Sequence, residues 1–444
     1  MGRRAVRRRR RPSVNAPSRV PDTCVSEEAV PTDLTPHGRR PRVLHLTQPV
    51  DGGVARVVTD LVRAQLADGL DVAAVCPDSP LTTRLRSLGA HLRTWEATRS
   101  PGPSLVREVR QLKELVDELR PDLIHAHSAK AGLAGRLAVR GRIPTVFQPH
   151  AWSFEAVGGT TAALALRWER WAARWASRVI CVSEAERDTG VGAGIRGRWT
   201  VVPNGIDPER FRPAEDTRPV RAQLAARHGV DADAPLVVCV GRLCRQKGQD
   251  VLLRAWDAVL RQVPGARLAL VGDGPDHDRL RAGAPGSVLF TGAVADAAPW
   301  YQAADLVVLP SRWEGMALAP LEAMACARPV VVTDVDGARE SLPPSLAGRC
   351  LVPPEDPRAL ARTVAALLLD PPLRASLGDR ARRHVLSLHD VRHTARAVAD
   401  VYRDLLGARP AATGARPLLT AGGAAADRTT QRVEHSEHRE SIHS

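Results

Sequence analysis

The feature that most restricts the fold of this chain is a regular alternation of short β-type runs with helical segments, which begins near Arg42. Repeated βα units of this kind require parallel strands with helices on both faces of the sheet. The alternation therefore predicts an α/β fold. The expected strands are Arg42–Thr47, Asp71–Cys76, Asp122–Ala126, Thr145–Gln148, Val179–Val182, Trp199–Val202, Leu236–Val240, Arg267–Val271, Ser287–Phe290, Leu306–Leu309 and Val330–Thr333.

A polar, proline-bearing stretch at Asp207–Pro219 interrupts the alternation and is the best candidate linker. Two Rossmann-like parallel-sheet domains are expected on either side of it, facing a central cleft. Ligands of open α/β sheets bind at the carboxyl ends of the strands, so the cleft is the expected site. The predicted parts are a disordered basic arm (1–40), an N-terminal domain (41–210), a C-terminal domain (219–388), a C-terminal helix (389–407) whose return to the N-terminal domain is left open, and a disordered tail (408–444).

The charge of the chain points to an anionic partner. Lys and Arg number 63 against 49 Asp and Glu, a net charge of +14 in 444 residues, and half of that excess lies in the first 42 residues. No apolar stretch follows the N-terminal arginines and no run of about 18 apolar residues occurs, which excludes a secretory signal and a spanning helix. The seven cysteines form no C-x-x-C pair and are expected to be reduced thiols. These features favour a cytoplasmic protein, with attachment to the inner face of the plasma membrane as a further candidate.

Two loops that follow predicted strands of the N-terminal half contain candidate ligand-binding residues. Gly53 belongs to a Gly-Gly turn that opens a helix, which suits either close approach to an anion or an ordinary tight turn. His150 follows the strand Thr145–Gln148, where it is either structural or directed at the cleft.

The loop after Leu236–Val240 contains Arg242 and Lys247, and Lys247 is one of only three lysines in the chain. A guanidinium fork and an ammonium five residues apart suit a diphosphate. A solvated basic loop is the alternative interpretation.

The strand Leu306–Leu309 is followed by Glu314 and Glu322, which are eight residues apart and flank the start of a helix. Carboxylates here are acceptors for vicinal hydroxyls, while free backbone N–H groups of the loop can meet phosphate or hydroxyl oxygens. We expect both acids to face one ligand.

These motifs, with Val202–Asp207, Val182–Glu184 and Asp122–His127, resemble the family 4 glycosyltransferases of GT-B fold over about residues 42–405. The resemblance implies a retaining transferase that moves a sugar from a nucleotide diphosphate sugar and needs neither a metal nor another cofactor. A UDP-sugar is the favoured donor and GDP-mannose the alternative. The likeness is closest to bacterial surface-polysaccharide transferases, which implies a glycan or a lipid-linked acceptor.

The resemblance also implies roles for individual residues. Arg242 and Lys247 would hold the diphosphate, Glu322 the ribose and Glu314 the transferred sugar. His150 would touch that sugar, and Gly53 would lie near the diphosphate and the acceptor, on the acceptor-side N-terminal domain. Backbone N–H groups would come from Gly315, Met316, Ala317 and Leu318. Met316 and Ala317 replace the family's usual aromatic residue and proline, which bears on the choice of sugar.

The helix expected at Thr161–Ser177 carries Trp168, Trp171 and Trp175 beside a stripe of arginines. Packing of the tryptophans on the sheet and contact with an anionic membrane surface are the two interpretations. A nucleotide-sugar epimerase or hydrolase on the same scaffold is the alternative activity. Nucleic acid is not an expected partner, because aromatic platforms are scarce: Tyr and Phe number two and four.

Overall fold

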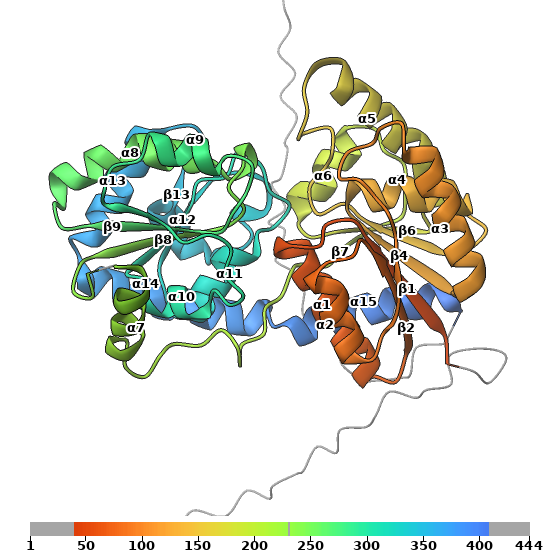
Figure 1. The fold of residues 1–444 in the computed structure, drawn as a ribbon, viewed down its shortest axis with the longest axis horizontal. Coiled ribbons are helices and arrows are strands. Elements are labelled where there is room, and N and C mark those ends of the chain that lie inside the picture. Colours follow the sequence, from red (N-terminus) through yellow and green to blue (C-terminus); the bar gives the residue numbers. More distant parts are fainter. Residues whose placement is uncertain (1–39, 230, 408–444) are drawn as a thin grey trace, which may run out of the picture. The chain divides into compact units, whose positions relative to one another are not determined.

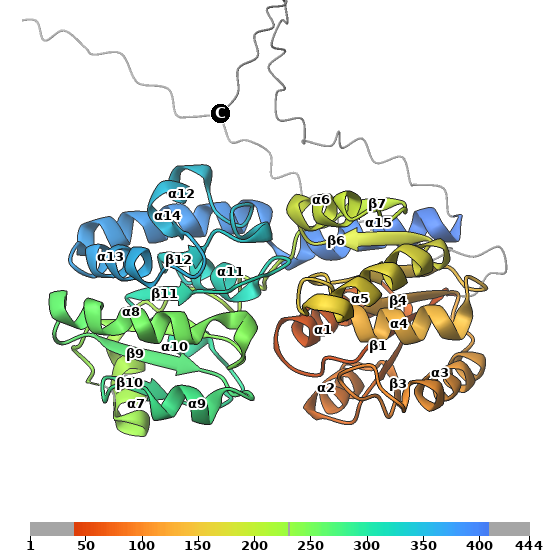
Figure 2. The same cartoon turned by 90° about the horizontal axis from the view of Figure 1, so that it is seen from above.

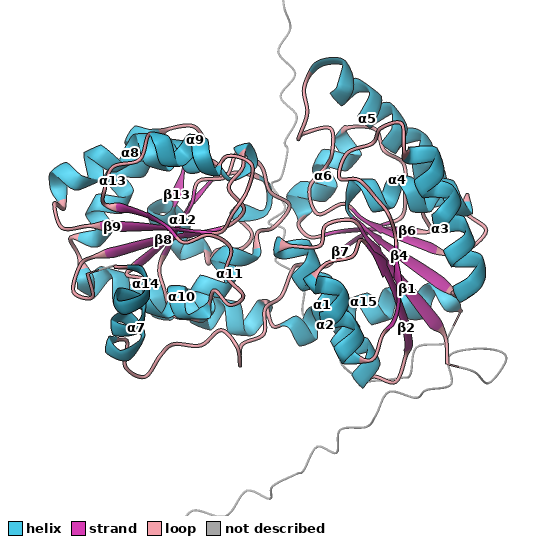
Figure 3. Cartoon of the chain, viewed as in Figure 1, coloured by secondary structure: helices cyan, strands magenta, loops and turns pink. Residues whose placement is uncertain are grey.

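The computed structural model describes residues 40–229 and 231–407. The predictions of a disordered arm and of a disordered tail fall outside these residues, apart from Arg40. The described part belongs to one compact unit built on two parallel sheets, each with helices on both faces (Figures 1 and 3). The α/β fold with two Rossmann-like domains is confirmed.

The N-terminal sheet has seven strands in the spatial order β3 (His91–Thr94), β2 (Asp71–Cys76), β1 (Arg42–Thr47), β4 (Leu123–His127), β5 (Thr145–Gln148), β6 (Arg178–Cys181) and β7 (Trp199–Val201). Most of these strands are buried along their length, as expected where helices cover both faces. The helices are α1 (Gly52–Ala67), α2 (Pro80–Leu88), α3 (Leu105–Leu119), α4 (Ser128–Val139), α5 (Gly159–Ala172) with the 3₁₀ turn Ala173–Trp175, and α6 (Glu184–Gly192).

The C-terminal sheet has six strands in the order β10 (Val288–Phe290), β9 (Arg267–Val271), β8 (Leu236–Val240), β11 (Leu306–Leu309), β12 (Val330–Thr333) and β13 (Leu351–Val352). Helices α8 and α13 pack together on one face, and α11 and α14 on the other (Figures 1 and 2). The helices are α7 (Arg218–His228), α8 (Gln249–Gln262), α9 (His277–Ala282), α10 (Ala298–Ala303), α11 (Leu318–Ala325), α12 (Pro344–Cys350), α13 (Pro357–Leu368) and α14 (Pro371–Leu388), with 3₁₀ turns at Arg245–Lys247 and Asp336–Ala338.

The strand order reverses once in each sheet, and this fixes where ligands bind. In the N-terminal sheet β1 lies between β2 and β4, and in the C-terminal sheet β8 lies between β9 and β11. The crevice outside the carboxyl ends of such neighbours is the usual ligand site of an open α/β sheet. The loops after β8 and β11 therefore meet at one point, and they are the loops that carry Arg242, Lys247 and Glu314.

The last helix, α15 (Val391–Leu406), packs on α1 of the N-terminal domain. The segment that leads into α15 lies beside the segment that first joins the two domains. The N–H of Ile206 donates to the carbonyl of His389 at 2.8 Å, and the N–H of Val391 donates to the carbonyl of Ile206 at 2.9 Å. The two connections between the domains are thus hydrogen-bonded to each other.

All eleven strands predicted from the sequence are present, with ends within one residue of those expected. The sequence did not predict two strands, β3 and β13, or the helices α2, α6, α7, α9, α10 and α12. Of the strands, β3 is largely exposed and lacks an apolar alternation, and β13 has only two residues. The helix expected to reach Ser177 instead ends at Ala172. Among the described residues, no helix combines the length and the apolar character needed to cross a bilayer.

Candidate active site

The loop after β8 is held against the loop after β11 by a close backbone contact at Gly248. This residue has a φ of +64°, and a Cβ built on it would lie 2.0 Å from the carbonyl oxygen of Pro310. A side chain is therefore excluded both by the conformation and by the space. The contact fixes the position of Lys247, the residue just before it.

Lys247 and Glu314 come together across these two loops. The Lys247 ammonium lies 2.5 Å from Oε1 of Glu314, and the Ser311 hydroxyl donates to the same oxygen at 2.6 Å. The Glu314 side chain is 9% exposed, so the ion pair is largely removed from water. An ammonium has three donors, and Glu314 takes one of them. Lys247 can therefore bind a second anion without releasing Glu314.

Arg242 stands at the start of the same loop with part of its guanidinium unpaired. Its Nη1 is buried and has no hydrogen-bond partner among the described residues. Its backbone carbonyl accepts from Nε2 of Gln249 at 3.0 Å, which anchors the residue to α8. A buried guanidinium nitrogen without a partner is costly, and an anion at this point would satisfy it.

Glu322 lies on α11 with partners different from those of Glu314. Its Oε2 accepts from the Tyr301 hydroxyl at 2.7 Å, and its Oε1 lies 3.4 Å from Nε of Arg56 on α1. Burial raises the pKa of Glu322, while Arg56 and Tyr301 oppose the rise. In the structure Glu314 bonds the β8 loop, and Glu322 bonds α10 and α1. That both acids face one ligand stays a prediction.

The segment between the two acids contacts the N-terminal domain. The Gly315 carbonyl accepts from the Ser183 hydroxyl at 3.0 Å, and the Met316 carbonyl accepts from Nδ2 of Asn204 at 2.7 Å. A Cβ at Gly315 would lie 2.8 Å from Val182, so the approach requires glycine. These carbonyls face protein. The N–H groups of Gly315, Met316, Ala317 and Leu318 stay predicted ligand contacts, and the N-cap residue of α11, Ala317, makes no side-chain cap hydrogen bond.

Gly53 lies against the same segment. A Cβ at Gly53 would be 3.8 Å from Cδ1 of Leu318, which is ordinary van der Waals contact. The structure thus brings the first turn of α1 to the start of α11. A role of Gly53 beside the diphosphate stays a prediction.

His150 follows β5 in a backbone conformation that few residues adopt. Its φ is +58° and that of Ala151 is +112°, and such strain concentrates at functional sites. The Ala151 N–H donates to Oε1 of Glu186 at 2.6 Å, which holds the strained turn. Burial lowers the pKa of His150 to about 3, so the ring is neutral at pH 7.

Sequence reasoning missed Arg56, Tyr301 and Glu186. The Ser183-x-x-Glu186 spacing matches a helix-capping signature and was the one available signal. Ser183 does cap α6, since its hydroxyl accepts from the Glu186 N–H at 3.0 Å. The Glu186 carboxyl instead accepts from Val182 and Ala151, and burial raises its pKa to about 7.

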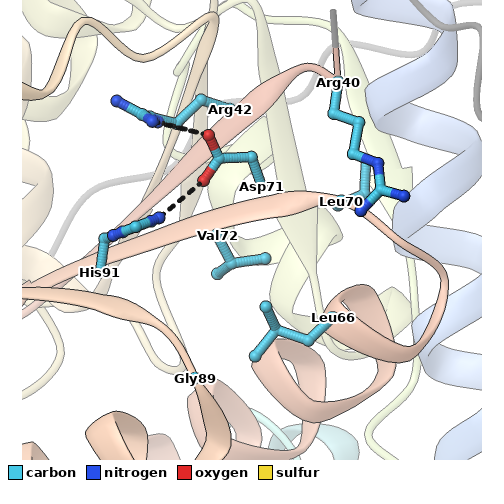
Figure 4. Close-up of a pocket in the computed structure, with 8 residues that line it drawn as sticks. All are labelled: Arg40, Arg42, Leu66, Leu70, Asp71, Val72, Gly89 and His91. Atoms are coloured by element: carbon cyan, nitrogen blue, oxygen red, sulfur yellow. Dashed lines mark hydrogen bonds and ion pairs between the residues drawn. The ribbon is translucent and has the colours of Figure 1, made fainter.

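A cavity of about 470 Å³ lies elsewhere, at the amino ends of β1 and β2 (Figure 4). Asp71 forms an ion pair there with Arg42 at 2.7 Å, and its other carboxylate oxygen lies 3.5 Å from Nε2 of His91. None of the predicted site residues lines it. Because ligands of this fold bind at the opposite ends of the strands, the cavity is not a candidate for the donor site.

The fold has two parallel-sheet domains, and neighbouring loops of the C-terminal sheet carry an Arg–Lys pair and two buried acids. This arrangement is that of a glycosyltransferase of GT-B fold. A family model described as "Glycosyltransferase Family 4" matches residues 51–210, and one described as "Glycosyl transferases group 1" matches residues 234–370. The chain is 34% identical over 332 residues to a D-inositol 3-phosphate glycosyltransferase of Kineococcus radiotolerans. The aligned region covers 67% of this chain and 74% of that enzyme. The chain belongs to glycosyltransferase family 4.

Other relatives agree with this assignment. A UDP-Gal:alpha-D-GlcNAc-diphosphoundecaprenol alpha-1,3-galactosyltransferase of Escherichia coli is 28% identical, over 65% of this chain and 78% of that one. The solved structure of Anabaena HepE with UDP-glucose has a TM-score of 0.70 at 26% identity, over 82% of this chain and 99% of that one. Both comparisons support an enzyme that uses a nucleotide sugar and do not favour the epimerase or hydrolase alternative.

Proposed function

We propose that this enzyme transfers a hexose from a UDP-sugar to a lipid-linked or glycan acceptor with retention of configuration at the anomeric carbon. The observation that carries the donor assignment is the unpaired, buried Nη1 of Arg242 beside the Lys247–Glu314 pair, at the strand-order reversal of the C-terminal sheet. UDP is favoured because Anabaena HepE was solved with UDP-glucose and the E. coli relative is named for UDP-Gal. GDP-mannose is the second candidate, since another relative is named a GDP-mannose-dependent mannosyltransferase.

The donor side is expected to work by electrostatic stabilisation. As the bond between the anomeric carbon and the phosphate oxygen breaks, its electron pair passes to the departing diphosphate. Arg242 and Lys247 would offset that charge, so donor binding needs no metal ion. Glu322 would accept from the ribose hydroxyls and Glu314 from a hydroxyl of the sugar. The acceptor hydroxyl would attack on the face that the diphosphate leaves and give its proton to a phosphate oxygen. His150, being neutral, would contact the sugar through a hydrogen bond.

The acceptor side would lie near α5, whose surface suits an anionic membrane. Leu164 is 65% and Trp171 45% exposed. Trp171 packs on Trp175 with ring centroids 4.3 Å apart, and the Arg174 guanidinium lies 3.9 Å from the centre of the Trp171 ring. The Trp168 ring centroid lies 5.4 Å from that of Trp171 and 6.4 Å from that of Trp175, so the three tryptophans cluster with each other, and Trp171 reaches the surface. Exposed apolar groups beside arginines match the chemistry of a bilayer interface.

We expect α5 to attach the enzyme to anionic vesicles. The Leu164→Ser/Trp171→Ala variant should bind vesicles containing phosphatidylglycerol at least about tenfold more weakly than the wild type, because the apolar contact is lost while the arginines remain. Co-sedimentation with anionic and with neutral vesicles measures this. The matched control is Val106→Ser, which removes an apolar side chain that is 71% exposed on α3. Equal vesicle binding by all three proteins would refute the role of α5.

The donor assignment is tested by a panel of UDP-, GDP-, ADP- and dTDP-sugars in a thermal unfolding assay. A ligand that binds only the folded state raises the melting temperature. At a ligand concentration of a hundred times its Kd, the free energy of unfolding increases by about 2.7 kcal/mol. We expect a UDP-sugar to give the largest rise, and the product formed from it to keep the donor's anomeric configuration by NMR. The proposal would be overturned if none of the nucleotide sugars raised the melting temperature, or if the product had the inverted anomeric configuration.

A further inference from the structure

Three histidines of the N-terminal sheet form a buried cluster to which the proposed transfer reaction assigns no role. His45 lies on β1 opposite His125 on β4, and His127 follows two residues later on the same face of β4. All three are fully buried. One ring nitrogen of each lies within 4.8 Å of those of the other two.

Two inner nitrogens of this cluster face each other, and the third lacks a well-formed hydrogen bond in the part of the chain that the structure describes. Nδ1 of His45 lies 3.0 Å from Nε2 of His127, so the two share a single proton between them at most. Nε2 of His125 is buried and makes no hydrogen bond of good geometry among the described residues, and Gln148 is the polar side chain that interacts with this ring. A buried ring nitrogen without a partner needs an explanation.

The outer nitrogen of each ring, by contrast, meets a group that can accept its proton. Nε2 of His45 lies 2.7 Å from Oε1 of Gln65, Nδ1 of His125 lies 2.6 Å from the Tyr402 hydroxyl, and Nδ1 of His127 lies 3.1 Å from Nε2 of His150. With their protons on these outer nitrogens, the three inner nitrogens all present lone pairs. Metal-binding histidines are held in this way, with the second nitrogen fixed by an outer partner.

We propose that His45, His125 and His127 bind one divalent transition-metal ion of the zinc type. Imidazole is a preferred ligand of such ions, and three histidines with a water or hydroxide complete a four-coordinate zinc site. Metal binding requires neutral rings, and burial lowers the pKa of His45 to about 4 and those of His125 and His127 well below their usual range. The ion would lie on the N-terminal sheet, whereas Arg242 and Lys247 follow β8 of the C-terminal sheet, and the diphosphate contacts proposed for them would not involve it.

The position of the cluster indicates what the ion would do. Gln65 belongs to α1 and Tyr402 to α15, so the site would join the returning C-terminal helix to the N-terminal sheet. The ion would also influence His150, because it would fix the tautomer of His127, whose Nδ1 lies 3.1 Å from Nε2 of His150. With metal on Nε2 of His127, the proton stays on its Nδ1 and is donated to Nε2 of His150, which leaves the His150 proton on Nδ1. Without metal, His127 can donate to His45 instead, and His150 can carry its proton on Nε2.

The test measures the metal directly, with the full-length, tag-free chain. After growth with zinc and dialysis, the wild type should hold about one zinc per chain by elemental analysis. The ion should be replaceable by Co²⁺ with the visible absorption of a four-coordinate site. The His125→Phe variant should lose this zinc, although it keeps the histidines of the tail at positions 435, 438 and 443. His389→Gln is the matched control, because His389 is also buried but bonds the Asn204 carbonyl away from the cluster.

A milder variant keeps the test valid if His125→Phe does not fold. Tyr402→Phe removes only the hydroxyl beside His125 and should weaken zinc binding by about ten- to a hundredfold in a competition with a chelator. Nitrogen-15 NMR of the histidines should show the His150 tautomer change when zinc is removed. A wild type that takes up no stoichiometric zinc or cobalt, or a His125→Phe variant that retains full zinc, would overturn the proposal and leave the donor site unaffected.

Discussion

Replacing Lys247 by alanine is expected to lower kcat by about two to three orders of magnitude, the usual loss when one group that stabilises developing charge is removed. Lys247 lies on the same loop as Arg242 and bonds Glu314 at 2.5 Å, so its loss removes a cation from the proposed diphosphate site. It also leaves Glu314 buried with only Ser311 as a side-chain donor. Steady-state kinetics with the preferred nucleotide sugar measures the effect, and circular dichroism checks the fold.

The matched control for Lys247→Ala is Lys113→Ala. Lys113 is exposed on α3, and its loss should change neither kcat nor stability appreciably. Turnover of Lys247→Ala at the wild-type rate would show that Lys247 does not stabilise the departing diphosphate.

Glu322→Ala is expected to raise the KM for the donor by about ten- to a hundredfold, since a hydrogen bond to a charged group contributes about 1.5–3 kcal/mol. The variant removes the acceptor proposed for the ribose and leaves Arg56 without its partner on α11. The effect on kcat should be smaller, because the ribose lies away from the bond that breaks. Initial rates at varied donor concentration separate the two constants.

The Tyr301→Phe variant distinguishes the effect of the Glu322 carboxylate itself from the effect of its hydrogen bond to Tyr301. It removes the hydroxyl that donates to Glu322 at 2.7 Å and keeps the carboxylate itself. The donor KM of this variant should stay within about threefold of the wild type, because the ribose acceptor is still present. An equal rise of KM in Tyr301→Phe and Glu322→Ala would instead assign Glu322 a packing role.

The strands and the order of the site loops can be predicted from the sequence because they depend on local patterns. Each buried strand reads as a short apolar run, and the loop that follows it must reach the carboxyl edge of the sheet. The sequence alone therefore predicts that Arg242, Lys247 and Glu314 lie at one edge. It does not predict their pairing, because Lys247 and Glu314 are brought together by the packing of Gly248 on Pro310.

The residues that sequence reasoning missed depend on contacts between distant segments. Arg56 reaches Glu322 only because α1 lies beside α11, and no local pattern encodes that approach. His45 and His125 meet through the register of β1 on β4, and Tyr402 joins them because α15 returns to the first domain. The Trp/Arg helix is ambiguous in sequence because periodicity places tryptophans on a face without saying what covers that face.

The measurement that tests the donor site most directly compares the binding of UDP and uridine by titration calorimetry, in the wild type and in Arg242→Ala. If the buried Nη1 of Arg242 meets the diphosphate, the wild type should bind UDP at least about a hundredfold more tightly than uridine, as charge-assisted hydrogen bonds predict. Arg242→Ala should lose most of that preference and bind uridine as before. Equal affinities of the wild type for UDP and uridine would contradict a diphosphate site at this loop.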